Sequence, residues 1–547
     1  MKIVQLYLLS ILGGVLLAMG WFPYGWTPLL FVGFVPLLTI EQIISTNHFR
    51  HKYLLLLGCT FTTFIIWNII TTWWVKNASL GGGVMAIIAN TILMTFLFLL
   101  IHTVSNRIGR RWRSIVFICF WMSFEFYHLR WDLSWPWLTI GNGFANHPNW
   151  IQWYEYTGVF GGSLWVLVVN LMVAGFIGLK NNQDKKQIFK SLSFKKAKTL
   201  GVLIPLLALP FILSYTILHF RSDNEKEKVK VVVVVVQPNI DPYNEKFNVS
   251  FDTQLRKMLK LAALKTDSTT DYLLFPETAI QDNLWEGKLD QSASIQTLRE
   301  FVMPFPKLKI IIGANSSRSF GKGETPSITA RTFGDDTTTY YDDYNTAIQI
   351  DTSDSIQVYH KSRLVPGVEK MPFPFLFKYF EKYALSLGGT AGSYGTQDDR
   401  TNLVARDTKV KTAPVICYES IYGEFVSEYI TNGAQFISII TNDGWWGDTP
   451  GYKQHLRFGA LRAIETRKWI ARSANTGISC FVSPMGEIQQ ATDYWKPAVI
   501  GQQIGLNNEL TFYVRYGDYI ARTAIYITLL LILYSWLIRF KVIPKQK

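Results

Sequence analysis

Long apolar runs at both ends of the chain constrain its fold more than any other feature of the sequence. A bilayer core about 30 Å thick is crossed by a helix of roughly 20 apolar residues. Seven such runs precede residue 221 and an eighth lies near the C-terminus, at residues 3–20, 27–40, 53–75, 83–104, 114–127, 158–179, 200–220 and 519–538. We therefore expect an eight-helix transmembrane bundle, with the first run retained as a membrane helix rather than cleaved as a signal peptide.

Basic residues between these runs predict their orientation, because Lys and Arg accumulate in short cytoplasmic loops. Arg50 and Lys52 lie between the second and third runs, four arginines between the fourth and fifth, and seven lysines between the sixth and seventh. Both termini are then cytoplasmic, and the large segment 221–518 lies on the outer side. This placement accounts for the net charge of +14 without nucleic acid as a partner.

The segment 221–518 has the pattern of a soluble domain between the membrane parts 1–220 and 519–547. Six consecutive valines at 231–236 predict a strand buried on both faces. Further strands are expected at 272–275, 309–313, 346–351, 413–416, 436–441 and 477–483, with helices near 251–263 and 455–471 and a polar turn or hairpin at 335–343. Alternating strands and helices predict an α/β sandwich.

Three polar residues follow apolar strands of this domain and are candidates for chemistry. Cys417 ends the strand 413–416, where a following helix would lower the pKa of its thiol. Glu277 follows the strand 272–275, where partial burial would raise the pKa of a general base. Lys361 follows another probable strand. Each has a simpler interpretation alone: a buried cysteine, a capping carboxylate and a solvated lysine.

Together, a carboxylate, an ammonium group and a thiol suit acyl transfer through a thioester. The base takes the thiol proton, the thiolate attacks a carbonyl, and the ammonium group with backbone N–H groups stabilises the oxyanion. The sequence therefore predicts a cysteine-dependent acyl-transfer enzyme.

The chain resembles the nitrilase superfamily and, more closely, the apolipoprotein N-acyltransferase family, over nearly its whole length. The motifs that carry the resemblance are Phe275-Pro-Glu-Thr278, His360-Lys-Ser-Arg-Leu-Val-Pro366, Val415-Ile-Cys-Tyr-Glu-Ser420, Thr441-Asn-Asp-Gly-Trp-Trp-Gly447 and Arg472-Ser-Ala-Asn-Thr-Gly477. Where the family commonly has Leu-Val-Pro-Phe-Gly-Glu, this chain has Leu364-Val-Pro-Gly-Val-Glu369, so the glutamate keeps its spacing and the aromatic residue is lost.

The resemblance implies an external nitrilase-like αββα sandwich on a membrane bundle, in an α+β membrane protein. It implies that Glu277 is the general base, Lys361 the oxyanion stabiliser and Cys417 the nucleophile. Glu369 would be a second essential glutamate, and Tyr418 and Glu419 would flank the nucleophile as supporting residues.

The resemblance also implies a reaction, its partners and its location. An acyl chain would pass from a phospholipid, typically phosphatidylethanolamine, through Cys417 to the α-amino group of a diacylglyceryl-cysteine at the N-terminus of an apolipoprotein. The enzyme would be a monomer in the bacterial inner membrane, with a periplasmic catalytic domain and without a cofactor or metal ion.

Other interpretations of the sequence predict different functions. A Cys417–Cys480 disulfide is a structural alternative for the thiol, and the external domain lacks the ligand spacing of a metal hydrolase. A membrane-tethered amidase that releases its product to water would use the same triad. A transporter or scaffold would not need Cys417. No role is assigned to Glu125, His128 or the aromatic segment 371–380.

Overall fold

The chain is divided into two compact units in a computed structural model that describes residues 2–178, 188–221, 229–246, 248–333, 336–371 and 393–540. The first unit, called the helical unit here, comprises Met1–Trp73, Gly83–His219 and Tyr516–Lys547. The second, called the sandwich unit, comprises Trp74–Gly82 and Phe220–Arg515. The segment 371–380, apart from Met371, lies outside the described residues.

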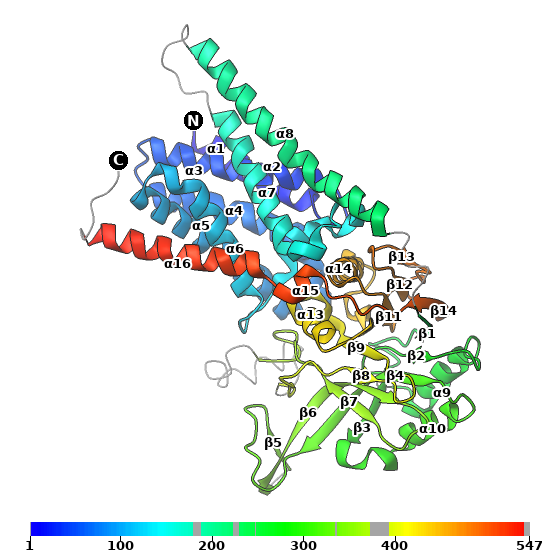
Figure 1. Cartoon of the computed structure of the whole chain (residues 1–547). Coiled ribbons are helices and arrows are strands. Elements are labelled where there is room, and N and C mark those ends of the chain that lie inside the picture. The colour runs from blue at the N-terminus through cyan, green and yellow to red at the C-terminus, as the bar shows by residue number, and fades with distance from the viewer. Residues whose placement is uncertain are drawn as a thin grey trace. The chain divides into compact units, whose positions relative to one another are not determined.

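The helical unit is built mainly from apolar helices, coloured from blue through cyan to the green of α8 in Figure 1, and the red C-terminal helix. They are α1 (Ile3–Met19), α2 (Leu30–Gly33), α3 (Val35–Thr46), α4 (Lys52–Thr72), α5 (Leu80–Ile108), α6 (Arg113–His128), α7 (Tyr154–Gly178), α8 (Ile188–Arg221) and α16 (Tyr519–Arg539). α1 and α4 pack closely, since a Cβ on Gly14 would lie only 2.6 Å from the carbonyl oxygen of Thr63. Close packing through small residues is typical of membrane helices.

Six helical segments among the described residues are long and apolar enough to cross a membrane. They are Thr27–Thr46, Lys52–Asn77, Leu80–Ile108, Tyr154–Ile177, Leu200–Arg221 and Tyr519–Arg539. α1 is apolar but has 17 residues, and α6 has 16. At 1.5 Å per residue these two helices reach only about 25 Å. The chain is therefore a multi-pass membrane protein, while the count of eight spans stays a prediction.

The sandwich unit contains two β-sheets. The first has the strand order β14-β1-β2-β4-β6-β5, with β3 paired to β4 and β7 to β6, and the second has the order β13-β12-β11-β10-β9-β8. The strands of the first sheet are β1 (Lys230–Gln237), β2 (Tyr272–Leu274), β3 (Ile280–Trp285), β4 (Lys309–Ser319), β5 (Arg331–Phe333), β6 (Asp336–Ile350), β7 (Gln357–His360) and β14 (Ala498–Gly505). Those of the second are β8 (Leu403–Val404), β9 (Lys411–Ile416), β10 (Phe436–Thr441), β11 (Ile470–Ala474), β12 (Cys480–Val482) and β13 (Ile488–Gln489).

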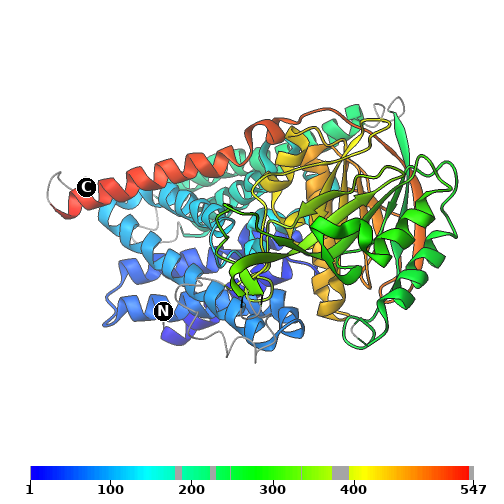
Figure 2. The same cartoon turned by 90° about the horizontal axis from the view of Figure 1, so that it is seen from below.

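Helices cover the outer faces of both sheets (Figures 1 and 2). α9 (Phe251–Ala262) and α10 (Ala293–Val302) pack on the first sheet, and α13 (Gly423–Thr431) and α14 (Pro450–Thr466) pack on the second. The short α15 (Phe512–Tyr516) comes just before α16 in the chain. The α/β sandwich predicted for this part of the sequence is confirmed.

The valine strand β1 shows how the core is built. Val231, Val233 and Val235 lie in the core that contains Phe436 and Phe481 of the second sheet. The intervening Val234 and Val236 lie in the core shared with α9 and α10. Alternate side chains of a strand point to opposite faces, so a strand between a sheet and a helical layer needs apolar residues at every position.

Several predicted boundaries are wrong for physical reasons. The hairpin predicted for the polar stretch 335–343 is confirmed, because β5 pairs with β6 in antiparallel register, with Arg331 opposite Tyr341. Its end is wrong, however, since the same strand continues to Ile350 and also pairs with β4, where Tyr341 lies opposite Ser319. The predicted helix 455–471 ends earlier, because Arg467 adopts φ +53° and Ile470–Ala474 forms β11. Strands β3, β11 and β14 were not predicted, since their alternation of apolar and polar residues is weak.

The sandwich unit also includes Trp74–Gly82, the chain segment that connects α4 to α5. Trp74 packs edge-on against Trp446, with ring centroids 4.9 Å apart. Asn77 donates a side-chain hydrogen bond to the carbonyl oxygen of Trp446 at 2.9 Å. A Cβ at Gly451 would lie 2.4 Å from the Trp74 ring, so this glycine makes room for the indole.

Candidate active site

Cys417 lies at the turn where β9 ends and a 3₁₀ helix, Cys417–Ile421, begins. Its backbone adopts φ +49°, a left-handed conformation that non-glycine residues rarely adopt. Strained backbone of this kind is concentrated at functional sites. The residue is half-buried, and the Ser420 hydroxyl donates to its carbonyl oxygen at 2.7 Å. The turn therefore presents one thiol at the end of a buried strand.

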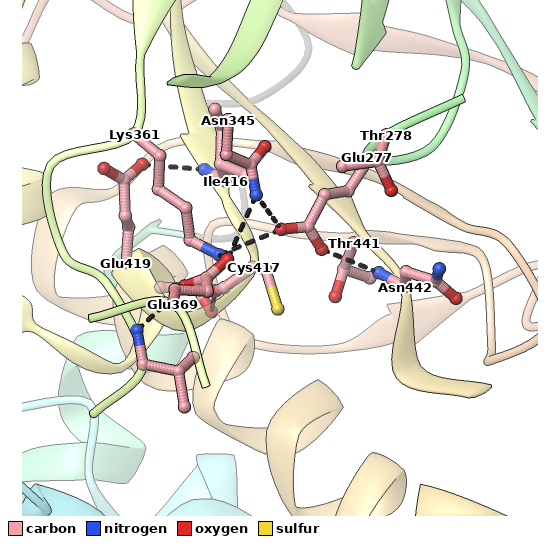
Figure 3. A network of polar contacts seen from close by, with 12 residues as sticks. Glu277, Thr278, Asn345, Lys361, Glu369, Ile416, Cys417, Glu419, Thr441 and Asn442 are labelled. Carbon is pink, nitrogen blue, oxygen red and sulfur yellow. Dashed lines mark hydrogen bonds and ion pairs between the residues drawn. The ribbon is translucent and has the colours of Figure 1, made fainter. Parts of the chain in front are cut away.

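Glu277 follows β2 after Phe275 and Pro276, and its carboxylate is nearly enclosed, with the residue 7% exposed. One oxygen accepts hydrogen bonds from Lys361 Nζ at 2.9 Å and from Asn345 Nδ2 at 2.8 Å. The other accepts the backbone N–H of Asn442 at 3.0 Å. Figure 3 shows the carboxylate held from three directions, with the Cys417 sulfur in the same cluster.

Lys361 follows β7 and brings two glutamates together. Its buried ammonium group donates to Glu277 at 2.9 Å and to Glu369 at 2.7 Å. The second oxygen of Glu369 accepts the backbone N–H of Val365 at 2.8 Å, within the loop that carries both residues. The structure thus brings together the three predicted catalytic residues and Glu369.

The charges in this cluster set its protonation. Burial lowers the pKa of Lys361, but the charges of Glu277 and Glu369 outweigh it and raise this pKa well above its ordinary value. Burial raises the pKa of Glu277, but the charge and hydrogen bond of Lys361 bring this pKa below its ordinary value. The raised pKa expected for Glu277 is therefore wrong, because a buried cation lies next to it.

The lowered pKa expected for Cys417 is also wrong. Burial and the charge of Glu277 raise the pKa of the thiol well above its ordinary value, and Lys361 offsets this only in part. A thiol that stays protonated beside an ionised carboxylate needs that carboxylate to take its proton. The geometry therefore favours base-assisted attack over a standing thiolate.

Glu419 and Tyr418, the residues after Cys417, are buried. Glu419 accepts hydrogen bonds from the Tyr359 hydroxyl at 2.7 Å and from the backbone N–H groups of Ser362 at 2.7 Å and Ile416 at 2.8 Å. Tyr418 packs edge-on against Tyr422, with ring centroids 5.4 Å apart. Both residues shape the surroundings of Cys417.

Sequence reasoning missed two asparagines of the cluster. Asn345 donates to both Glu277 and Glu369, at 2.8 and 3.1 Å, from the middle of β6. Asn442 follows β10 and contributes only its backbone N–H to Glu277. A signal for Asn345 was its position directly before the predicted strand 346–351, whereas a backbone contact leaves no trace in the sequence.

A second missed group consists of Asp443, His455 and Arg472. Potential ligand atoms of Cys417, Asp443 and His455 lie within 4.8 Å of one another. However, Arg472 donates to Asp443, and the His455 ring lies 3.0 Å from Asp443 and 3.1 Å from the carbonyl oxygen of Cys417. With a guanidinium group on the carboxylate and both ring nitrogens engaged, these atoms favour a hydrogen-bonded support of the turn over a cation site.

The disulfide alternative is wrong. All four cysteines, each in the described part of the chain, are free thiols. Cys480 is buried in β12, opposite Arg472 of β11.

Comparisons with known proteins identify the families that the two parts of the chain resemble. Residues 13–172 match the model of the apolipoprotein N-acyltransferase N-terminal domain, and residues 233–508 match the carbon-nitrogen hydrolase model. The apolipoprotein N-acyltransferase of Chlorobaculum tepidum is 27% identical over 94% of this chain and 93% of its own length. That of Geobacter metallireducens is 26% identical over 94% and 92%, and that of Aquifex aeolicus 27% identical over 67% and 70%. The resemblance predicted from the motifs is confirmed.

Proposed function

Because this chain belongs to the carbon-nitrogen hydrolase family, and its N-terminal part matches the apolipoprotein N-acyltransferase N-terminal domain, we propose that it is a phospholipid:apolipoprotein N-acyltransferase. The observation that carries the proposal is the half-buried Cys417 thiol beside the Glu277–Lys361–Glu369 cluster, in a chain whose described residues include six helices apolar enough to cross a membrane. Such a chain can meet lipid substrates by lateral diffusion.

The first half-reaction forms a thioester. Glu277 takes the thiol proton of Cys417 as the sulfur attacks the ester carbonyl of a phospholipid. Lys361, held at full charge by two carboxylates, stabilises the negative oxygen of the tetrahedral intermediate. The C–O ester bond then breaks, the leaving alkoxide takes the proton from Glu277, and a lysophospholipid departs.

The second half-reaction transfers the acyl chain to an amine. The α-amino group of the diacylglyceryl-cysteine of an apolipoprotein attacks the thioester carbonyl while Glu277 takes a proton from the nitrogen. The C–S bond breaks, the sulfur regains the proton from Glu277, and the acyl chain remains as an amide. In each half-reaction Glu277 thus acts first as a base and then as an acid, so that one carboxylate carries the proton in both.

The remaining assignments belong to the same proposal. Residues 1–220 and 519–547 form the membrane part and residues 221–518 the periplasmic catalytic domain of a bacterial inner-membrane protein with cytoplasmic termini. The basic residues between the apolar runs support this orientation. Phosphatidylethanolamine is the proposed donor, and the active protein is a monomer.

The test is a reconstituted reaction of the full-length protein. Detergent-solubilised protein is incubated with phosphatidylethanolamine labelled in its acyl chains, first alone and then with a diacylated lipopeptide. We expect intact-mass analysis to show an acyl adduct on Cys417 and, after addition of the lipopeptide, transfer of label to its α-amino group. Cys417→Ala removes both signals, and Cys480→Ala, a matched substitution of a buried free thiol, keeps both.

Two outcomes contradict the proposal. Labelled fatty acid without an amide product identifies a hydrolase that uses the same residues. An adduct that persists in Cys417→Ala excludes the thioester at this residue.

A further inference from the structure

A second buried lysine, Lys246, lies beside the general base, and the proposed mechanism does not use it. It belongs to the turn that follows β1 and is 7% exposed. Its Nζ donates a hydrogen bond to the Thr278 hydroxyl at 2.6 Å. Thr278 follows Glu277 directly and adopts φ +47°, so the lysine holds the turn that carries the carboxylate in an unfavourable backbone conformation.

The surroundings of Lys246 keep its ammonium group out of bulk water. Lys246, Glu277, Thr278 and Asn442 line a cavity of about 10 Å³, which is room for roughly one water molecule. On another side, the ring of Trp445 has its centroid 5.8 Å from Nζ. Electrostatic interactions across such an enclosed space are screened much less than at a surface.

The balance of charges near Glu277 explains why a second cation, Lys246, would stabilise the ionised carboxylates. The cluster around Lys361 holds two carboxylates, Glu277 and Glu369, but only one ammonium group. Lys246 supplies the second positive charge and makes the group neutral overall. The Cys417 thiol and the Tyr394 hydroxyl also interact electrostatically with Glu277.

We propose that Lys246 is a positioning residue for the general base: it fixes the Glu277–Thr278 turn and keeps Glu277 ionised while Lys361 interacts with the substrate oxyanion. This inference rests on the proposed role of Glu277. As Lys361 turns toward a developing oxyanion, its interaction with Glu277 weakens, and the charge of Lys246 remains.

The protonation of Lys246 is consistent with this role. Burial lowers the pKa of Lys246 to about 8, while the charge of Glu277 raises it. Its ammonium form therefore predominates at neutral pH. In turn, Lys246 is one of the cations that lower the pKa of Glu277.

Alkylation of Cys417 by iodoacetamide tests the inference without any lipid substrate. The rate is measured on full-length protein in detergent between about pH 3 and about pH 9, because the pKa of Glu277 lies below the ordinary value of a glutamate. The Cys417 peptide is quantified by mass spectrometry. In wild type the rate falls at acid pH as Glu277 becomes protonated. In Lys246→Met we expect the midpoint of this fall to rise by about one pH unit, the lower end of the effect of a nearby opposite charge, so that alkylation below the midpoint is roughly tenfold slower.

Three further variants make the result specific. Lys246→Gln keeps a donor for Thr278 but has no charge, and it should show the same shift as Lys246→Met. Thr278→Val removes the hydrogen bond but keeps the charge, and it should lower the plateau rate with little shift of the midpoint. Lys257→Met removes an exposed lysine of α9 that donates to the carbonyl oxygen of Asn239, and it should match wild type.

The outcomes separate this inference from the proposed function. If Glu277→Gln abolishes the acid limb and both neutral Lys246 variants keep the wild-type midpoint, Lys246 does not act through its charge and the inference is overturned. If Glu277→Gln leaves the acid limb unchanged, Glu277 is not the base, and the proposed mechanism fails with it. Thermal unfolding of each variant shows whether the fold is intact.

Discussion

Glu419 joins the two halves of the site: its carboxylate accepts the backbone N–H of Ser362 at 2.7 Å, although the two residues come from different sheets. The same carboxylate accepts the backbone N–H of Ile416 at 2.8 Å. Ser362 follows Lys361, and Ile416 precedes Cys417. One buried side chain thus ties the backbone beside Cys417 to the backbone beside Lys361.

This position makes the stability of the sandwich unit depend on pH. Burial raises the pKa of Glu419 to about 7, although hydrogen bonds from the Ser362 and Ile416 N–H groups lower it. Because the folded pKa lies above that of the unfolded chain, the folded state holds this proton more tightly. The protonation of Glu419 therefore adds to the free energy of unfolding, fully below about pH 4.5. This contribution of roughly 3 kcal/mol is lost as the pH rises through about 7.

Thermal unfolding of full-length wild type and Glu419→Gln at pH 5 and pH 8 measures this effect. We expect wild type to lose more stability than the variant between the two values. Glu428→Gln, at an exposed position of α13, serves as the control and should follow wild type. Equal losses in all three proteins would show that Glu419 does not titrate in this range.

Asn345→Asp should slow thioester formation by about 100-fold. The change replaces a neutral donor to Glu277 and Glu369 with a third negative charge, which raises the pKa of Glu277 and leaves Lys361 opposite three carboxylates. The rate of Cys417 acylation by labelled phospholipid measures it. Asn248→Asp, in an exposed turn, should keep the wild-type rate; a similar fall there would show a general effect of added charge.

Gly313→Ala should displace the turn that carries Glu277. A Cβ at this position of β4 would lie 2.6 Å from both the Glu277 Cα and the Thr278 backbone nitrogen. Overpacking of this kind costs about 1–3 kcal/mol, and we expect the acylation rate to fall at least tenfold. Gly287→Ala is the matched control, because nothing lies within 4 Å of its added Cβ. An active and stable Gly313→Ala would contradict the geometry described here.

His455→Leu should loosen the nucleophile turn. The His455 Nε2 atom lies 3.1 Å from the carbonyl oxygen of Cys417 and 3.0 Å from the Ser420 hydroxyl. The Ser420 hydroxyl still donates to the Cys417 carbonyl oxygen in this variant, so the cost is that of the lost hydrogen bonds, about 0.5–1.5 kcal/mol each. We expect slower acylation of Cys417 and a lower unfolding temperature, with partial rescue in His455→Gln, whose amide can still donate. Wild-type behaviour of His455→Leu would remove His455 from the support of the site.

The sequence predicted Cys417, Glu277 and Lys361 as a group because each follows an apolar strand, and the ends of such strands carry sites in α/β folds. Their protonation could not be predicted in the same way. The pKa of Glu277 depends on Lys361, which is 84 residues away in the chain, and burial of Cys417 depends on both sheets. Sequence patterns report local structure, whereas these effects arise from contacts made only in the folded domain.

In the fold, too, elements with a clear local sequence pattern were predicted, whereas elements that depend on contacts with distant residues were missed. Strands that are apolar on both faces, such as β1 and β10, were predicted with nearly correct ends. The polar half of β6 was predicted as a turn or hairpin and does form a hairpin with β5. Its pairing with β4 was not predicted, because these polar residues are stabilised by strand pairing rather than by burial. The end of α14 was missed because a left-handed Arg467, a residue type with no preference for that conformation, stops the helix.

The Trp74–Gly82 segment has a practical consequence for work with the catalytic domain. A fragment cut at residue 221 would keep every catalytic side chain but would lose the indole that fills the space above Gly451, at the start of α14. It would also lose the Asn77 hydrogen bond to Trp446, in the loop that follows Asn442. The sandwich unit is therefore formed by two separate segments of the sequence. To express it alone, the Trp74–Gly82 segment would have to be added as a peptide or fused to the fragment.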